Sequence, residues 1–268
     1  MEKRFKWLSM PYILWMLLFI LFPIIIVIRY SVTREVMGDD ILTLEYYRRF
    51  FQSRYFVVLL QSIQLAFVCT VICLVIGYPM AYFIAEFPEK RRNTMMLLII
   101  LPMWMNFLLR TFAWISILSR HGLINQILLF LGLDPVKMLY TRGAILLGMV
   151  YNFLPFMILP IHTVLIKIEN SFVEAAQDLG ANRWQSFWKI EFPLSISGVI
   201  TGIMMVFIPA ISTFEISALL GGNKYNLIGN IVEYQFKTAG NWHYGSAIAV
   251  VLMTLIVLAL YITNKYEE

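Results

Sequence analysis

Charged residues are scarce in this chain of 268 residues: aspartate, glutamate, lysine and arginine together make up 14% of it. Hydrophobic residues make up 60%, whereas soluble domains contain about 45–50%. This composition excludes an ordinary soluble globular protein and predicts a membrane protein. The connections between the hydrophobic runs are too short to hold a separate soluble domain.

Cysteine and histidine are also rare, with two and three residues respectively. Cys69 and Cys73 lie within one hydrophobic run, so we expect them to fill space between helices rather than to form a disulfide. The histidines lack the spacing of metal ligands, and no G-x-S-x-G or H-E-x-x-H motif is present. We therefore predict that the chain is not an enzyme and holds no catalytic, cofactor-binding or metal-binding residue.

A phosphate-binding loop of the form G-x-x-x-x-G-K-[ST] is missing as well. The glycine-containing stretch at residues 221–224 is too short to be one. The chain is therefore not expected to bind ATP by that route. If it drives active transport, the energy comes from a separate subunit that holds ATP and magnesium.

The hydrophobic residues form runs of about 20 residues, the length that crosses a bilayer as a helix. Backbone groups in lipid must be hydrogen-bonded within the chain, which favours helices. We predict an all-α membrane protein with six transmembrane helices in a single domain over residues 1–268. The predicted spans are 7–28, 56–85, 94–118, 143–166, 194–220 and 246–262.

Clusters of basic residues predict the orientation. They occur at residues 3–6, before the first span, and at residues 90–92, in the short loop after the second span. The positive-inside rule places both in the cytoplasm, and an even number of spans returns the C-terminus to the same side. The net charge of +5 indicates topology and lipid contact rather than a nucleic-acid partner. We predict a multi-pass protein of the cell membrane.

A polar segment, residues 171–193, separates the fourth and fifth predicted spans. Ser171 and Glu174 have the S-x-x-E spacing of a capping box, which predicts the start of a helix. Gly180 follows about two turns later and is expected to end that helix in the left-handed conformation.

A second short helix is predicted directly after this stop. Asn182 and Gln185 have the spacing of an N-cap and its N3 partner. Pro193 is expected to end the second helix, because proline lacks an N–H donor and clashes with the preceding turn. Two short capped helices would form a rigid docking site at the membrane surface.

The same residues carry a family resemblance. The spacing of Glu174, Ala175, Ala176, Gly180 and the I-x-x-P at residues 190–193 resembles the EAA loop of ABC importer permeases. In that family the loop is the coupling helix, which sits in a cleft of the cytoplasmic ATPase. The resemblance implies a coupling role for Glu174, Ala175, Ala176, Gly180, Asn182 and Pro193. The alternative interpretation is an ordinary amphipathic loop.

The resemblance extends over nearly the whole chain. Residues 42–51, 101–106, 110–114 and 154–160 resemble motifs of the polyamine permeases in that family. This implies the type I ABC importer permease fold, also called MetI-like. It also implies a second homologous permease, two ATPase subunits that bind ATP and magnesium, and an extracytoplasmic binding protein for spermidine or putrescine.

Three alternatives to a polyamine importer follow from the same observations. Related permeases for putrescine alone, ferric iron, sulfate or thiamine share much of the pattern. A stand-alone secondary transporter or channel would work without an ATPase, and the absence of an inverted repeat argues against it. A multipass membrane enzyme would need a reactive cluster, and the sequence has none.

Polar residues inside the predicted spans are candidates for the translocation pathway. Glu215 is the one acid well inside a hydrophobic span, where a carboxylate is costly unless it faces protein or water. Arg110 shares a helical face with Asn106, and Trp104 and Trp114 offer rings that bind cations or anchor the helix at the interface. The alternative role of Glu215 is a structural ion pair with Arg110.

Small residues and prolines predict close contacts and bends. Gly198 and Gly202 have the small-xxx-small spacing that allows two helices to approach closely. The partner helix belongs either to the same chain or to another. Pro102, Pro155 and Pro209 are the predicted bends, because unwound backbone at membrane depth is tolerated where it lines a cavity.

Overall fold

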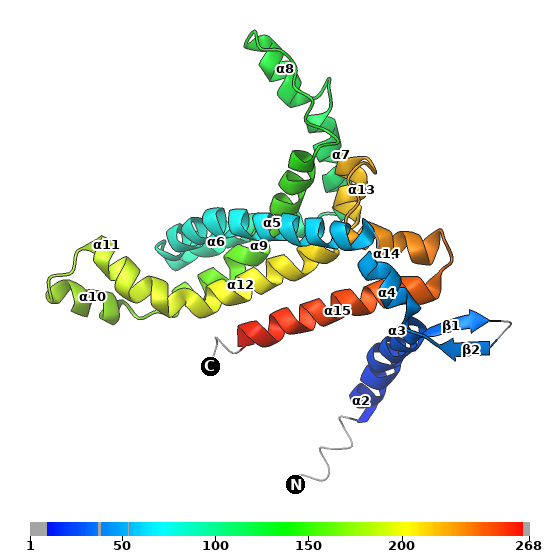
Figure 1. The fold of residues 1–268 in the computed structure, drawn as a ribbon. Coiled ribbons are helices and arrows are strands. Elements are labelled where there is room, and N and C mark those ends of the chain that lie inside the picture. Colours follow the sequence, from blue (N-terminus) through cyan, green and yellow to red (C-terminus); the bar gives the residue numbers. More distant parts are fainter. Residues whose placement is uncertain (1–9, 37–38, 53, 265–268) are drawn as a thin grey trace. The chain divides into compact units, whose positions relative to one another are not determined.

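The computed structural model describes residues 10–36, 39–52 and 54–264, which are mostly helical. The chain forms two compact units, one of residues 1–58 and 231–259 and one of residues 59–230 and 260–268. The basic residues at 3–6 lie outside the described part. Figure 1 shows the elements.

The helical elements follow one another along the chain with few breaks (Figure 1). They are α2 (Met10–Met16), the π-helix η1 (Leu17–Leu21), α3 (Phe22–Val32), α4 (Glu45–Gln52), α5 (Arg54–Ala85), α6 (Glu89–Trp104), α7 (Phe107–Leu118), α8 (Leu123–Phe130), α9 (Arg142–Leu165), α10 (Asn170–Asp178), α11 (Arg183–Ser186), the π-helix η2 (Phe187–Glu191), α12 (Phe192–Ser212), α13 (Glu215–Gly221), α14 (Ile228–Lys237) and α15 (Trp242–Asn264). The strands β1 (Thr33–Val36) and β2 (Asp39–Leu42) pair antiparallel, with Thr33 opposite Leu42.

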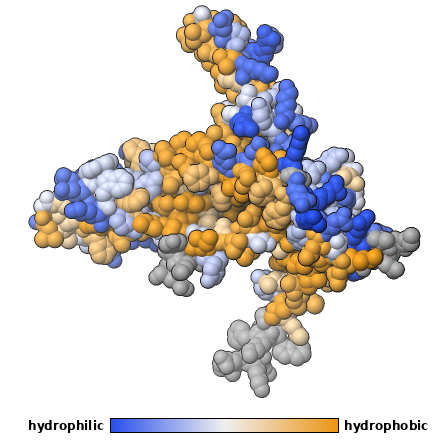
Figure 2. Space-filling view, viewed as in Figure 1, coloured by the Kyte–Doolittle hydropathy of each residue, from blue (hydrophilic) through white to orange (hydrophobic). Residues whose placement is uncertain are grey.

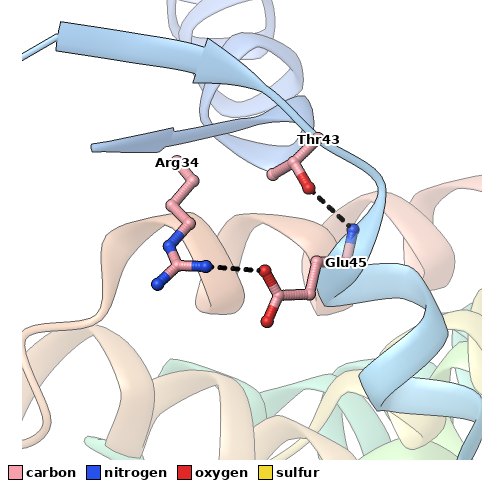
Figure 3. Close-up of polar contacts among 3 residues, drawn as sticks. All are labelled: Arg34, Thr43 and Glu45. Carbon is pink, nitrogen blue, oxygen red and sulfur yellow. Dashed lines mark hydrogen bonds and ion pairs between the residues drawn. The ribbon is translucent and has the colours of Figure 1, made fainter. Parts of the chain in front are cut away.

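In the first unit, polar contacts fix the turn from the β-hairpin into α4. The Nη1 atom of Arg34 donates to Oε2 of Glu45 at 2.8 Å, and the backbone N–H of Glu45 donates to Oγ1 of Thr43 at 3.1 Å (Figure 3). The hydroxyl satisfies a backbone donor at the start of the helix, where no intrahelical partner exists. The ion pair is exposed, so it contributes at most about 1 kcal/mol to stability, and its main effect is to orient the start of α4 relative to the hairpin.

An aromatic cluster connects α4 to the start of α15 in the same unit. Tyr244 is 1% exposed, and its ring lies 5.9 Å from Tyr46 and 5.8 Å from Tyr55. The guanidinium of Arg49 lies 5.0 Å from the Tyr244 centroid, within cation–π range. This packing holds α4 against α15.

In the second unit, α9 and α12 lie against each other with almost no gap. A Cβ atom added at Gly198 would lie 2.9 Å from the carbonyl oxygen of Pro160 and 3.1 Å from Cα of Ile161. One added at Gly202 would lie 2.8 Å from Sδ of Met157. The close approach predicted from Gly198 and Gly202 is therefore confirmed, and the partner helix belongs to the same chain.

Helix α5 packs against this pair through a face of small residues. Cys69, Cys73 and Ala81 are fully buried, and a Cβ atom at Gly77 would lie 3.0 Å from Cγ of Met157. Both thiols are free. The expected role of the two cysteines as packing residues is confirmed.

Five segments of the described chain are long and hydrophobic enough to cross a membrane: Met10–Val32, Arg54–Ala85, Arg142–Leu165, Arg183–Ser212 and Trp242–Thr263. A sixth span results if the bent pair Glu89–Trp104 and Phe107–Phe130 counts as one. Figure 2 shows hydrophobic side chains over much of the visible surface of these helices. The first segment buries none of its most hydrophobic window inside the chain, as expected of a helix that faces lipid or another protein.

Two predicted spans are not continuous helices. The span predicted over 94–118 is broken between α6 and α7, and the segments Glu89–Trp104 and Phe107–Phe130 lie at 92° to each other. The span predicted over 194–220 ends at Ser212, and α13 begins afresh at Glu215. Each break comes shortly after a proline, Pro102 in α6 or Pro209 in α12, whereas α9 continues through Pro155. Hydrophobicity alone did not reveal these breaks, because both sides of each break are hydrophobic.

Candidate functional site

The polar segment between α9 and α12, residues 170–191, contains α10, α11 and η2. It is called the coupling segment below, after the role that the family resemblance implies. Helix α10 begins earlier than predicted, at Asn170, because Glu169 rather than Ser171 occupies the N-cap position, and it has no side-chain cap. The capping box predicted from Ser171 and Glu174 is wrong. The Ser171 hydroxyl instead donates to Oε2 of Glu169 at 3.2 Å, which leaves Glu174 exposed on the helix.

Gly180 ends α10 as predicted. Its φ of +89° lies in the region that favours glycine. The N–H of Gly180 bonds to the carbonyl of Gln177 at 2.9 Å, and the N–H of Ala181 bonds to that of Ala176 at 3.0 Å. This pair of bonds is a Schellman motif, which satisfies two carbonyls that a helix end leaves unbonded.

Asn182 begins the next helix with the predicted capping box. Its side chain accepts from the N–H of Gln185 at 2.8 Å, and its own N–H donates to Oε1 of Gln185 at 3.0 Å. The stop at Gly180 and the start at Asn182 are both closed by local hydrogen bonds. The turn between α10 and α11 is therefore well defined.

Pro193 does not end the second helix, contrary to the prediction. It lies in the first turn of α12, and the chain stays helical from Arg183 to Ser212. The π-helix η2 makes this possible: the N–H of Phe192 bonds to the carbonyl of Phe187, five residues back. The extra residue in this turn makes room for the proline ring, which otherwise clashes with a carbonyl in the preceding turn. The coupling segment is therefore one short helix followed by the end of a membrane-crossing helix.

An exposed apolar face runs along α10. Phe172, Ala175 and Leu179 have the spacing i, i+3 and i+7, so they share one face. Phe172 is 53% exposed and Leu179 is 90% exposed, while Ala175 is also exposed. This spacing is typical of a helix that inserts into a groove of a partner. Phe172 and Leu179 were not among the residues predicted from the sequence, although their periodicity was a usable signal.

A polar pocket of about 510 Å³ lies between α10 and the end of α5. Its charged lining residues are Glu86, Glu174, Arg183 and Glu191. Arg183 forms an ion pair with Glu86, which directly follows α5. This contact brings the basic residues 90–92, in the first turn of α6, and the coupling segment to the same end of the second unit.

Glu215 occupies a different position from the predicted one. It is the first residue of α13 and is exposed, just after the break at Thr213 and Phe214. A carboxylate at this place interacts favourably with the N-terminal end of the helix dipole. Among the described residues no ion pair joins Glu215 to Arg110, although α13 packs against α7.

Two of the remaining candidates for the pathway meet at one aromatic residue. The guanidinium of Arg110 lies 6.0 Å from the ring centroid of Tyr151 in α9. The ring of Trp114 contacts Tyr151 edge-on at 5.4 Å. The structure therefore brings Arg110 and Trp114 together.

Asn106 and Trp104 flank the break between α6 and α7. The Asn106 side chain caps α7 and accepts from the N–H of Leu108 at 2.8 Å. Trp104, near the end of α6, is 80% exposed. Within the described ranges, no group of three or more His, Cys, Asp or Glu residues is placed to hold a metal ion.

Comparison with known proteins gives matches over most of the chain. A family model described as "Binding-protein-dependent transport system inner membrane component" matches residues 52–266. The chain is 38% identical over 251 residues to the spermidine/putrescine transport system permease protein PotB of Escherichia coli (strain K12), covering 92% of this chain and 91% of that protein. It is 36% identical over 261 residues to the PotB protein of Haemophilus influenzae, covering 94% and 91%.

A solved structure has a similar fold. It is a chain of the bacterial alginate ABC transporter in complex with an alginate pentasaccharide-bound periplasmic protein. The TM-score is 0.80, and the match covers 98% of this chain and 93% of that one at 19% sequence identity. At this identity the likeness concerns the fold alone.

Proposed function

This chain belongs to the family of binding-protein-dependent transport system inner membrane components, and from this membership we propose that it is the permease subunit of an ATP-driven importer of spermidine and putrescine. The predicted fold and the family resemblance are confirmed. The proteins it matches are transport permeases and not enzymes. The observation that supports the substrate is the 38% identity to a spermidine/putrescine permease along 92% of the chain.

The coupling segment is the proposed contact with a cytoplasmic ATPase. Its apolar face, Phe172, Ala175 and Leu179, inserts into a cleft of that subunit, and Glu174 pairs with a basic side chain there. The small side chains of Ala175 and Ala176 allow close approach. The Schellman motif at Gly180 and the capping box at Asn182 keep α10 at a fixed angle to α11.

The proposed working complex contains this chain, a second homologous permease, two ATPases that bind ATP and magnesium, and an extracytoplasmic polyamine-binding protein. When the ATPase dimer closes on ATP, it draws the coupling segments together and opens the permease to the outside. Hydrolysis of ATP then returns the permease to the inward-open state. We place the coupling segment and both termini in the cytoplasm, in keeping with the basic residues 90–92 at the start of α6. The surface of the spans faces lipid.

The function is tested with the complex purified through a tag on this chain from its native membrane. Reconstituted into vesicles with ATP on the ATPase side, it is expected to accumulate labelled spermidine and putrescine from the opposite side in the presence of the binding protein. Replacing ATP by a non-hydrolysable analogue is the control and is expected to stop accumulation. Transport by this chain alone, driven by an ion gradient, would contradict the proposal.

Glu215 is the proposed acidic residue of the polyamine pathway, because it lies exposed at a break between α12 and α13. The change Glu215→Gln keeps the size and removes the charge, so spermidine uptake is expected to fall about 5- to 10-fold, as when one charge-assisted contact is lost. Loss of the helix-dipole interaction alone destabilises by less than about 1 kcal/mol, so the complex still assembles.

Two measurements separate the roles of Glu215. Uptake kinetics are compared with those of Glu233→Gln, a matched change on α14, and assembly is followed by size-exclusion chromatography. Uptake of Glu215→Gln equal to that of the wild type would make Glu215 a structural residue of α13.

A further inference from the structure

Three side-chain contacts tie the cytoplasmic half of α5 to the start of the long helix of α11, η2 and α12. The hydroxyls of Tyr78 and Ser195 lie 2.8 Å apart, the Tyr82 hydroxyl donates to Oε2 of Glu191 at 3.1 Å, and Arg183 donates to Glu86. Together they are here called the polar ladder: Tyr78–Ser195, Tyr82–Glu191 and Glu86–Arg183.

The ladder has a regular spacing. Tyr78, Tyr82 and Glu86 are four residues apart, so they follow one face of α5 and its continuation, where the N–H of Glu86 bonds to the carbonyl of Tyr82. Their partners follow in the reverse order along the chain, as expected of two antiparallel helices. A shift of one helix by one turn would break all the contacts together.

The environment of the contacts changes along the ladder. Ser195 is fully buried and Tyr78 is 8% exposed, whereas the side chains of Arg183 and Glu86 are 75% and 42% exposed. A buried hydroxyl pair costs more to break than an exposed ion pair, because the separated groups lose their partners without gaining water. The buried Tyr78–Ser195 pair therefore contributes most to the stability of the contact between the two helices. The other two pairs mainly fix the orientation of one helix relative to the other.

An aromatic side chain of the coupling segment fills the space between the rungs. The ring of Phe187 contacts Tyr82 edge-on at 5.1 Å and Tyr78 at 5.9 Å. Such edge-to-face pairs add about 0.5–1.5 kcal/mol each to the burial of the rings. The ladder is therefore both hydrogen-bonded and packed.

At its other end α5 reaches the segment that leads into α14. The N–H of Ile228 donates to Oγ of Ser62 at 2.9 Å. Helix α5 has 32 residues, so it spans about 48 Å at 1.5 Å per residue. One continuous helix thus links the coupling segment to the start of α14.

We propose that the polar ladder makes α5 and the coupling segment move as one body, so that Tyr82, Glu86, Arg183 and Glu191 are positioning residues that transmit the ATPase stroke to α5. This inference rests on the proposed function. The proposed role of these residues differs from a purely structural one because it concerns the movement of α5 during the transport cycle. Its tests therefore measure coupling as well as folding.

The first test exchanges the charges of the exposed rung. Glu86→Arg and Arg183→Glu each place like charges together, and each is expected to lower ATP-driven spermidine uptake about 5- to 10-fold, the range of coupling networks. The double exchange restores opposite charges and is expected to recover uptake to within about twofold. The control is Lys237→Glu, which disrupts the exposed pair with Glu233 on α14 and is expected to leave uptake near the wild-type value.

The second test holds the rung closed. The changes Glu86→Cys and Arg183→Cys are combined in the otherwise natural chain, since Cys69 and Cys73 are fully buried. Bifunctional methanethiosulfonate reagents of increasing length then join the two new thiols through disulfide bonds, which a reductant cleaves. A cross-linked complex is expected to keep its ATP-driven uptake, because the two segments do not separate during the cycle. Each single cysteine change, treated in the same way, is the control.

The outcomes separate the inference from the proposed function. If the wild-type complex shows no ATP-driven uptake, the proposed function itself is wrong. If the wild type transports but the cross-link stops uptake and reductant restores it, the segments must separate and the ladder inference is wrong. Exchange variants with wild-type uptake would also contradict it, whereas uptake through the cross-linked complex supports it.

Discussion

Replacement of Gly198 by leucine is expected to lower the yield of folded permease more than about tenfold. A Cβ atom at this position would lie 2.9 Å from the carbonyl oxygen of Pro160 and 3.1 Å from Cα of Ile161. Both are backbone atoms of α9 that no rotamer change can move. The remaining leucine atoms have no space, so α9 and α12 must separate, at a cost of about 3 kcal/mol, the upper end of the usual range for overpacking. This is a large part of a typical folding free energy of about 5–15 kcal/mol.

The measurement is the yield of monodisperse protein after solubilisation, together with its thermal unfolding. For Gly198→Leu the yield is expected to fall more than about tenfold, since 1.4 kcal/mol is a factor of ten in an equilibrium constant. Gly143→Leu is the matched control, because Gly143 lies in the first turn of α9 and a Cβ there meets only Oγ1 of Thr141 at 3.7 Å. A wild-type yield for Gly198→Leu would show that the two helices do not pack as described.

Replacement of Gly180 by valine is expected to lower ATP-driven uptake at least about tenfold while the protein remains in the membrane. No atom lies within 4 Å of an added Cβ atom at Gly180, so the cost lies in the backbone, whose φ of +89° a β-branched residue rarely adopts. A strained cap changes the angle between α10 and α11 and displaces the apolar face of α10. Uptake is expected to fall at least about tenfold, because misplacement of a coupling element weakens transmission.

A matched glycine provides the control for Gly180. Gly132 has a φ of +75° and also has no neighbour within 4 Å of an added Cβ atom, but it follows α8, away from the coupling segment. Gly132→Val therefore imposes similar backbone strain and is expected to keep its uptake. The measurements are spermidine uptake in vesicles and retention of the ATPase on the purified complex. Normal uptake by Gly180→Val would remove Gly180 from the coupling mechanism.

Local signals in the sequence predicted several parts of the coupling segment correctly. Gly180 and the pair of Asn182 and Gln185 act through hydrogen bonds within a few residues, so their spacing contains the required information. The prediction failed for Pro193 because a π-helical turn accommodates the ring. It failed for Ser171 because Glu169, just before the helix, takes its hydroxyl instead.

The breaks in the third and fifth predicted spans were not visible in the hydrophobicity of the sequence, although Pro102 and Pro209, two of the predicted bends, lie just before them. Hydrophobicity reports burial in lipid, and a bent pair of helices is as hydrophobic as a straight one. The break between α12 and α13 also decides where Glu215 lies. In a continuous span it would lie within a membrane helix, whereas in the structure it is the first residue of α13.

The sequence by itself determined the class of the protein, the approximate spans, the family and the capped turn at residues 180–185, because composition, periodicity and local hydrogen bonding are properties of neighbouring residues. Only the tertiary structure decided which helix packs against Gly198. It also decided that Tyr78, Tyr82 and Glu86 contact residues that are distant from them in the sequence. Tyr78 and Ser195 are 117 residues apart in sequence. Contacts of this kind depend on how whole helices pack against one another, and no local pattern contains that information.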